Sequence, residues 1–128
     1  MITISPIYIA LCALLYMCLA VRVVRQRYTA RTTHGDGGDK ELRKRIRAHG
    51  NLSEYAPMLL LMLVVMELQG SPGYVLHLFG ALILVSRTGH AYFISQTPES
   101  IKMRTLTMTT TFALLGVMAL GLLGHAIF

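Results

Sequence analysis

Four long apolar stretches restrict what this chain can fold into. They run over residues 5–24, 52–69, 73–94 and 105–128. A helix needs about 20 mostly apolar residues to cross a bilayer's hydrocarbon core, and the middle two stretches are shorter or more polar, so we expect both to extend as helix beyond it. The stretches are rich in Leu, Met and Ala and lack the alternation of a strand. The sequence therefore predicts an all-α integral membrane protein, a four-helix bundle.

The composition favours one membrane domain over an ordinary soluble one. Of the 128 residues, 54% are hydrophobic and 14% are charged. We place a single domain over residues 1–128. Basic residues follow the first apolar stretch rather than precede it, which argues against a cleaved signal peptide. Cys12 and Cys18 point to different faces of a helix, so they cannot bridge each other, and we interpret both as packing residues.

Basic residues are concentrated in two of the three expected connections. Nine of the twelve Lys and Arg residues lie between positions 22 and 47, and the other three are Arg87, Lys102 and Arg104. The expected second connection, residues 69–73, has none. The positive-inside rule then predicts that the first and third connections lie in the cytoplasm and both termini outside. This topology explains the net charge of +6, and no soluble binding module supports a nucleic-acid partner.

The second helix is expected to run from about residue 40 to residue 69, with Asp39 as its cap. At 1.5 Å per residue it would be about 45 Å long, which exceeds the ~30 Å hydrocarbon core, so its first turns should stand in the membrane interface. Pro57 lies inside this helix and predicts a kink or a loosened turn. For the fourth helix, we expect Pro98 or Glu99 in the first turn.

The strongest functional signal lies where the basic part of the second helix meets its apolar part. Arg47, Asn51 and Glu54 are spaced i, i+4, i+7 and share one helix face. Ionisable groups at membrane depth are costly and usually mark function. A cation, an amide and an anion on one face predict a cradle for a zwitterionic ligand. The alternative is a solvated helix start, which suits residues 43–45 better.

Two further groups lie at the same membrane level. Arg87 and His90 are spaced i, i+3 on the expected third helix; the alternatives are an ion pair between Glu54 and Arg87, a snorkelling Arg87, or a packing role for His90. Arg104 lies at the start of the fourth helix, where a guanidinium would favour a ligand's thiolate, unless it only snorkels. The threonines of residues 105–111 are most simply explained by helix packing. We find no metal-ligand spacing, Ser-His-Asp arrangement or cofactor fingerprint.

These residues carry a resemblance to a known family. Residues 47–57, with the sequence RAHGNLSEYAP, resemble the signature of the membrane-associated eicosanoid and glutathione metabolism (MAPEG) family. Residues 87–90 resemble its third-helix element, and Arg104 with Thr105 its fourth-helix site. The element order and the short second turn are similar too, so the resemblance spans nearly the whole chain. Residues 35–38 and 46–51 look most like the small bacterial branch.

The resemblance implies a four-helix protomer that assembles as a homotrimer in the bacterial inner membrane. Glutathione, as co-substrate, would lie between protomers near the cytoplasmic face, and no metal is implied. Arg104 would be catalytic, next to the sulfur. The implied glutathione-binding residues are Arg25, Arg47, Asn51, Glu54, Tyr55, His90 and Thr105.

The chain departs from the family pattern at three positions. Gly50 stands where some members carry a second Arg, and Ile94 and Met108 stand where some have tyrosines near the ligand, although Tyr92 is close by. The leading hypothesis is a glutathione transferase or peroxidase of lipophilic electrophiles or hydroperoxides. Because the family contains non-catalytic members, the alternative is a non-catalytic lipid- or glutathione-binding membrane protein. A small proton-coupled transporter is a third hypothesis, disfavoured by the strong charge asymmetry.

Overall fold

The computed structural model describes residues 2–127, which form four helices. The expected all-α architecture is confirmed for these residues, and residues 1 and 128 of the predicted domain lie outside them. The helices are α1 (Ser5–Ala30), α2 (Lys40–Leu68), α3 (Gly73–Ser95) and α4 (Ile101–Ile127).

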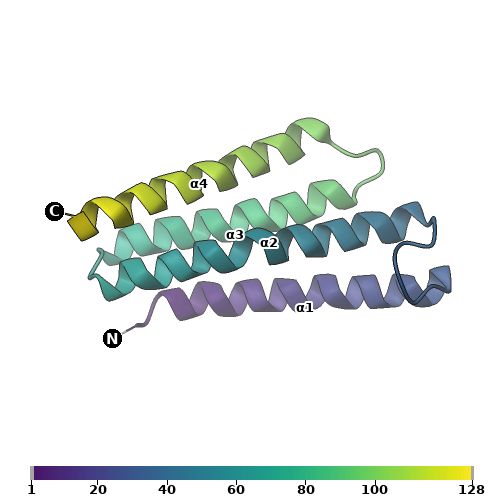
Figure 1. The fold of residues 1–128 in the computed structure, drawn as a ribbon, viewed down its shortest axis with the longest axis horizontal. Coiled ribbons are helices and arrows are strands. Elements are labelled where there is room, and N and C mark those ends of the chain that lie inside the picture. The colour runs from purple at the N-terminus through teal and green to yellow at the C-terminus, as the bar shows by residue number, and fades with distance from the viewer. Residues whose placement is uncertain (1, 128) are drawn as a thin grey trace.

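The four helices run up and down side by side, with both termini at the same end of the bundle (Figure 1). Helices α2 and α3 form the centre, because each contacts the other and both outer helices. Helices α1 and α4 flank this pair and do not contact each other. We call the end that carries the loops 31–39 and 96–100 the basic end. The residues around the predicted cradle lie toward this end, on the two central helices and α4.

Each helix is long and apolar enough to cross a membrane. The side chains on the outer faces are apolar as well: Leu14 of α1 is 59% exposed, Val85 of α3 68% and Leu120 of α4 71%. Helices that are hydrophobic all round are expected in lipid, not in water. The chain is a multi-pass membrane protein. Cys12 is buried as expected, but Cys18 is exposed on α1 and does not pack in the protomer.

The start of α2 follows the sequence prediction. The Asp39 carboxylate accepts a hydrogen bond from the Leu42 backbone N–H at 2.7 Å, which caps the helix. The helix then continues through Pro57 to Leu68. The prediction of Pro98 or Glu99 in the first turn of α4 was wrong by two or three residues, since the helix begins at Ile101 and Ser100 O accepts the Arg104 N–H at 3.0 Å. Glu99 lies in the loop before it, where its carboxylate turns back to Arg104.

At the end opposite the basic end, the Glu67 carboxylate near the end of α2 holds the start of α1. It accepts hydrogen bonds from the backbone N–H groups of Thr3, Ile4 and Ser5 at 2.6 to 2.7 Å, and from the Ser5 hydroxyl at 2.5 Å. The first N–H groups of a helix have no partner within it, and an anion there also complements the helix dipole. Glu67 therefore caps α1 from a different helix.

Two clusters of buried apolar side chains form the core. One lies toward the termini and includes Tyr8, Leu63 and Ile83 from three different helices; the other lies toward the basic end and includes Leu52 and Ala91. Helix α1 meets α3 closely in the first cluster, because the Tyr8 ring lies directly over Gly80. The Tyr8 hydroxyl is 3.0 Å from His77 Nδ1, which fixes the ring in this place.

Gly80→Ala is expected to destabilise the protein by about 1–3 kcal/mol, because the added methyl group would overlap the Tyr8 ring. Gly121→Ala is the matched control, since nothing lies within 4 Å of a methyl group there and alanine favours helix. Thermal unfolding in detergent micelles should show a lower midpoint for Gly80→Ala only. Equal midpoints would contradict the packing of Tyr8 on Gly80.

Acid is expected to loosen the first turn of α2. The hydrogen bond from the Leu42 N–H holds the pKa of the Asp39 carboxyl below its ordinary value of 3.8. Because the folded-state pKa is lowered, the stability that the cap contributes is fully present above the ordinary value of 3.8. It is lost as the pH falls through the folded-state pKa. Hydrogen exchange of the Leu42 amide should therefore accelerate below pH 3.8 beyond the intrinsic pH effect. Asp39→Asn keeps a capping oxygen that does not titrate, so it should remove this acceleration. An unchanged acceleration in Asp39→Asn would show that a group other than Asp39 causes it.

Candidate functional site

The predicted cradle residues of α2 divide into an exposed pair and a buried amide. Arg47 Nη1 lies 3.8 Å from Glu54 Oε1, and their side chains are 57% and 53% exposed. Asn51 lies between them in sequence but turns into the bundle, where it is 8% exposed. The exposed pair therefore lies on the surface of the protomer, and the amide belongs to a polar cluster inside it.

Arg87 of α3 is the centre of that cluster and is only 1% exposed. Its Nη1 donates to Asn51 Oδ1 at 2.9 Å, and its Nη2 donates to Thr111 Oγ1 and, at 3.4 Å, to Thr107 O. Its Cζ lies 5.6 Å from the centre of the Tyr55 ring, in cation–π geometry. Three helices thus meet around one buried guanidinium.

The structure decides between the alternatives for Arg87. It does not snorkel, because it is buried, and its contacts are to neutral groups instead of Glu54. Among the described residues, the ion pair of Glu54 is with Arg47. A cation removed from water without a carboxylate partner is expensive, and here hydrogen bonds and an aromatic face offset part of the cost.

His90 lies one turn after Arg87 and connects α3 to α4. Its Nδ1 is 3.1 Å from Thr107 Oγ1, and the Thr107 hydroxyl donates to Arg104 O at 2.9 Å. His90 Nε2 is buried and has no hydrogen-bond partner within residues 2–127. The predicted His90 and the backbone of the predicted Arg104 are therefore neighbours through Thr107.

The side chains of Arg104 and Thr105 lie along a surface groove of about 430 Å³ on α4. Arg104 Nη1 lies 2.5 Å from Glu99 Oε1, so the guanidinium is paired with a carboxylate from the preceding loop. Thr105 is exposed. Met108 and Phe112 form the apolar continuation of the groove toward the middle of the bundle. This geometry combines one cation with an apolar surface open to lipid.

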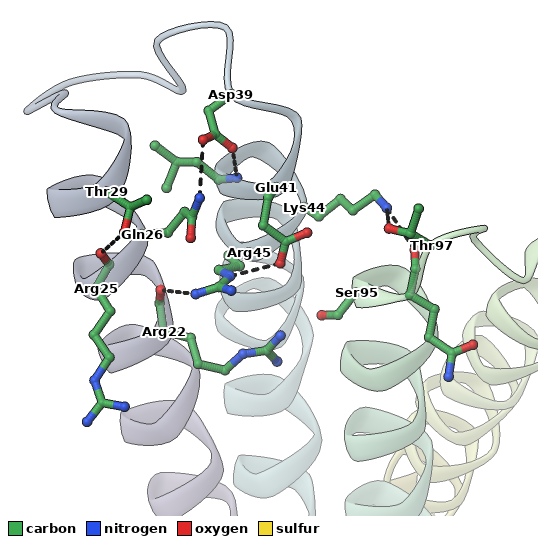
Figure 2. A network of polar contacts seen from close by, with 12 residues as sticks. Arg22, Arg25, Gln26, Thr29, Asp39, Glu41, Lys44, Arg45, Ser95 and Thr97 are labelled. Atoms are coloured by element: carbon green, nitrogen blue, oxygen red, sulfur yellow. Dashed lines mark hydrogen bonds and ion pairs between the residues drawn. The ribbon is translucent and has the colours of Figure 1, made fainter.

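Arg25 is not brought to the cluster within the protomer. Figure 2 shows its side chain on the face of α1 that points away from α2. The other predicted binding residues, apart from Arg47, Glu54 and Thr105, contact the Arg87 cluster or its extension through Thr107. A site that used Arg25 together with the cluster would need a second copy of the chain.

A second polar network closes the basic end (Figure 2). Lys44 of α2 donates to Gln96 O at 2.8 Å and to Thr97 Oγ1 at 2.6 Å, in the loop between α3 and α4. Arg45 donates to Arg22 O of α1 at 3.2 Å and to Glu41 at 3.0 Å. The interpretation of Lys44 and Arg45 as solvated charges was therefore wrong, because their long side chains reach groups on neighbouring elements.

Two residues of the cluster, Thr107 and Thr111, were not among the predicted site residues, because their threonine-rich stretch was interpreted as helix packing. Instead, the Thr111 hydroxyl accepts a hydrogen bond from Arg87, and the Thr107 hydroxyl forms a hydrogen bond with His90, so both contact α3 side chains. A signal was present, since Arg104, Thr107 and Thr111 are spaced i, i+3, i+7 and share a helix face. The partner of that face, Arg87, lies on another helix and is not visible from the spacing.

Comparison with known proteins agrees with the sequence resemblance. A sequence model of the MAPEG family matches residues 5–124 of this chain. The inner membrane protein YecN of Escherichia coli strain K12 is 39% identical over 89 residues, which cover 70% of this chain and 68% of YecN. YecN of Escherichia coli O6:H1 gives the same identity and coverage. No solved structure matches the chain significantly.

Lys44→Ala is expected to loosen the loop between α3 and α4, because two hydrogen bonds from the ammonium are lost. Exchange of the backbone amides of residues 96, 97, 99 and 100 should rise about fivefold to tenfold, equivalent to roughly 1 kcal/mol of local stability. Lys40→Ala is the matched control, since Lys40 is exposed at the start of the same helix. Equal exchange in the two variants would show that Lys44 does not hold this loop.

Proposed function

The chain belongs to the MAPEG family, and from this premise we propose that it is a glutathione-binding membrane protein that acts as a glutathione transferase or peroxidase on lipophilic compounds. The observation that carries the proposal is the polar cluster of Asn51, Arg87, His90 and Thr107, next to the backbone of Arg104. Such a cluster inside a membrane bundle is costly and usually marks a function.

Glutathione has two carboxylates, an ammonium group, two amide bonds and a thiol, and the residues present fit these groups. Arg47 offers a cation and Glu54 an anion for the charged ends of the tripeptide, while Asn51 offers an amide. Arg104, together with Thr105, lies beside an apolar groove that suits the sulfur and a lipophilic partner. His90 and Tyr55 support these groups from the cluster side, and Arg25 would come from a neighbouring protomer.

We assign the assembly as a homotrimer with the site between protomers. The exposure of Arg47 and Glu54, in a helix whose continuation is apolar, supports a neighbouring copy that covers them. The outward Arg25 also supports a shared site. The charge distribution supports a basic end in the cytoplasm and both termini outside, and the name of the Escherichia coli relative supports the bacterial inner membrane.

In the proposed transfer reaction the ligand's thiol proton passes to solvent, and the Arg104 guanidinium stabilises the thiolate. The thiolate sulfur attacks the electrophilic carbon of, for example, an aryl halide; the carbon–sulfur bond forms as halide leaves. With a hydroperoxide, two glutathione molecules are oxidised to the disulfide and the hydroperoxide is reduced to an alcohol and water. Arg104 is paired with Glu99 in the free protein, so the thiolate replaces a carboxylate.

Arg104→Ala is expected to lower the conjugation rate with 1-chloro-2,4-dinitrobenzene about 10- to 100-fold near pH 7, because a thiol pKa higher by one or two units leaves that much less thiolate. The pH profile of the rate should shift upward with it. Lys102→Ala, an exposed cation two residues earlier, is the control and should keep the rate. Equal rates for Arg104→Ala and the unmodified protein would refute the role of Arg104.

Binding measurements separate the alternatives. Saturable glutathione binding that Arg47→Ala and Glu54→Gln abolish, without turnover over a panel of electrophiles, would favour the non-catalytic binding protein. Substrate efflux that Glu54→Gln abolishes would favour the transporter. The outcome expected here is binding and turnover together, with the two α2 variants weakened in binding and Arg104→Ala weakened in turnover.

A further inference from the structure

The number of hydrogens on each group of the Arg87 cluster determines which groups donate hydrogen bonds and which accept them. A guanidinium only donates, so Thr111 Oγ1 must accept from Arg87 and give its own hydrogen elsewhere. Thr107 O lies 2.9 Å from Thr111 Oγ1 and takes it. The Thr107 carbonyl therefore receives the Thr111 hydroxyl as well as the weaker contact from Arg87 Nη2 at 3.4 Å.

The same rule orients Asn51. Because Arg87 Nη1 donates to it at 2.9 Å, the atom of the carboxamide that faces Arg87 is the oxygen. The carboxamide nitrogen then points away from Arg87; the hydrogen bond that the Asn51 side chain makes within residues 2–127 is the one its oxygen accepts. Asn51 can therefore offer its two N–H groups to a ligand, while its oxygen is held by Arg87.

Thr107 fixes the tautomer of His90. The Thr107 hydroxyl has one hydrogen, which is donated back along α4 to Arg104 O at 2.9 Å, a geometry typical of threonine in helices. With that hydrogen assigned to Arg104 O, the contact with His90 Nδ1 at 3.1 Å is a hydrogen bond from the ring N–H. In the neutral ring the hydrogen is on Nδ1, and Nε2 carries a lone pair. Nε2 is buried without a partner within residues 2–127, and on this assignment it is a free acceptor.

We propose that Arg87 and Thr107 are positioning residues, which hold Asn51 as a hydrogen-bond donor and His90 as the Nδ1-protonated tautomer with an accepting Nε2. The inference rests on the proposed function for the identity of the ligand, glutathione, and it adds how the site recognises it. The Asn51 carboxamide would donate a hydrogen bond to a carbonyl or carboxylate oxygen of the tripeptide. Thr107 joins the Arg104 turn of α4 to the α3 side of the site, since its hydroxyl contacts both His90 and Arg104 O.

The tautomer is tested without any ligand. In protein labelled with ¹⁵N in the histidine rings, the His90 resonances should show Nδ1 protonated and Nε2 bare at neutral pH. Thr107→Val removes the acceptor and should abolish this preference, whereas Thr107→Ser should retain it. Thr110→Val is the matched control, because the Thr110 hydroxyl only contacts Leu106 O on its own helix. An Nε2-protonated ring in the unmodified protein, or a Thr107→Val ring that keeps the Nδ1 proton, would overturn the assignment.

The orientation of Asn51 is tested by stability and binding together. Asn51→Asp gives Arg87 an ion pair, so thermal stability should be retained, but it replaces the ligand-facing N–H groups with an oxygen and should weaken glutathione binding at least about tenfold. Asn51→Ala leaves Arg87 without this acceptor and should lower stability as well. An Asn51→Asp protein that folds and binds glutathione as tightly as the unmodified protein would overturn the donor role.

Binding measurements on the Thr107 variants separate failure of this inference from failure of the proposed function. Thr107→Val should raise the KM for glutathione about five- to tenfold, and Thr107→Ser should restore it. Unchanged KM with a lost tautomer preference would overturn the positioning role while glutathione binding stands. An Nδ1-protonated His90 in a protein that binds no glutathione at all would support the hydrogen-bond assignment and overturn the proposed function.

Discussion

The buried guanidinium of Arg87 is the constraint around which this bundle is arranged. A cation in a membrane interior is costly unless its N–H groups find acceptors, and a single helix does not supply them. The Nη groups of Arg87 find theirs on two neighbouring helices, whereas its buried Nε–H has none within residues 2–127. Here the acceptors come from Asn51 on α2 and from Thr107 and Thr111 on α4. The Arg87 side chain on α3 therefore depends on both neighbouring helices for its hydrogen bonds. Apolar contacts alone are weak determinants of register in lipid, because lipid tails are as apolar as leucine. The hydrogen bonds of the polar cluster set the register of α2, α3 and α4 relative to one another.

This arrangement separates two kinds of residue at the basic end. Lys44, Arg45 and Asp39 connect the helices and loops, and their contacts are internal to the protomer. Arg47, Glu54 and Arg25 lie outside the cluster with their side chains exposed or turned outward. The first kind connects the helices and loops of this end, and the second kind makes the exposed charges that the proposed glutathione site uses. Only some of the basic residues at this end therefore stabilise the fold of the protomer.

Much of the fold was visible in the sequence, and part of the site was not. The spans, the Asp39 cap and the extent of α2 follow from local signals, because helix length, capping and apolar runs are properties of neighbouring residues. The family resemblance was confirmed by the match over residues 5–124. The partner of Arg87 was not predictable, since Glu54 and Asn51 are both within a turn on α2 and only the packing of three helices selects the amide. Thr107 and Thr111 were missed for the same reason: their spacing is local, but their function is defined by α3.

The capping of α1 by the Glu67 carboxylate has a consequence for the order in which the contacts of the bundle can form. The carboxylate that caps the first helix is 62 to 64 residues further along the chain, so this cap can form only once the end of α2 lies beside the start of α1. Glu67 thereby joins the open end of the hairpin of α1 and α2 using groups of these two helices and the residues before α1 alone. The Arg87 cluster, by contrast, is complete only when α2, α3 and α4 are all in place.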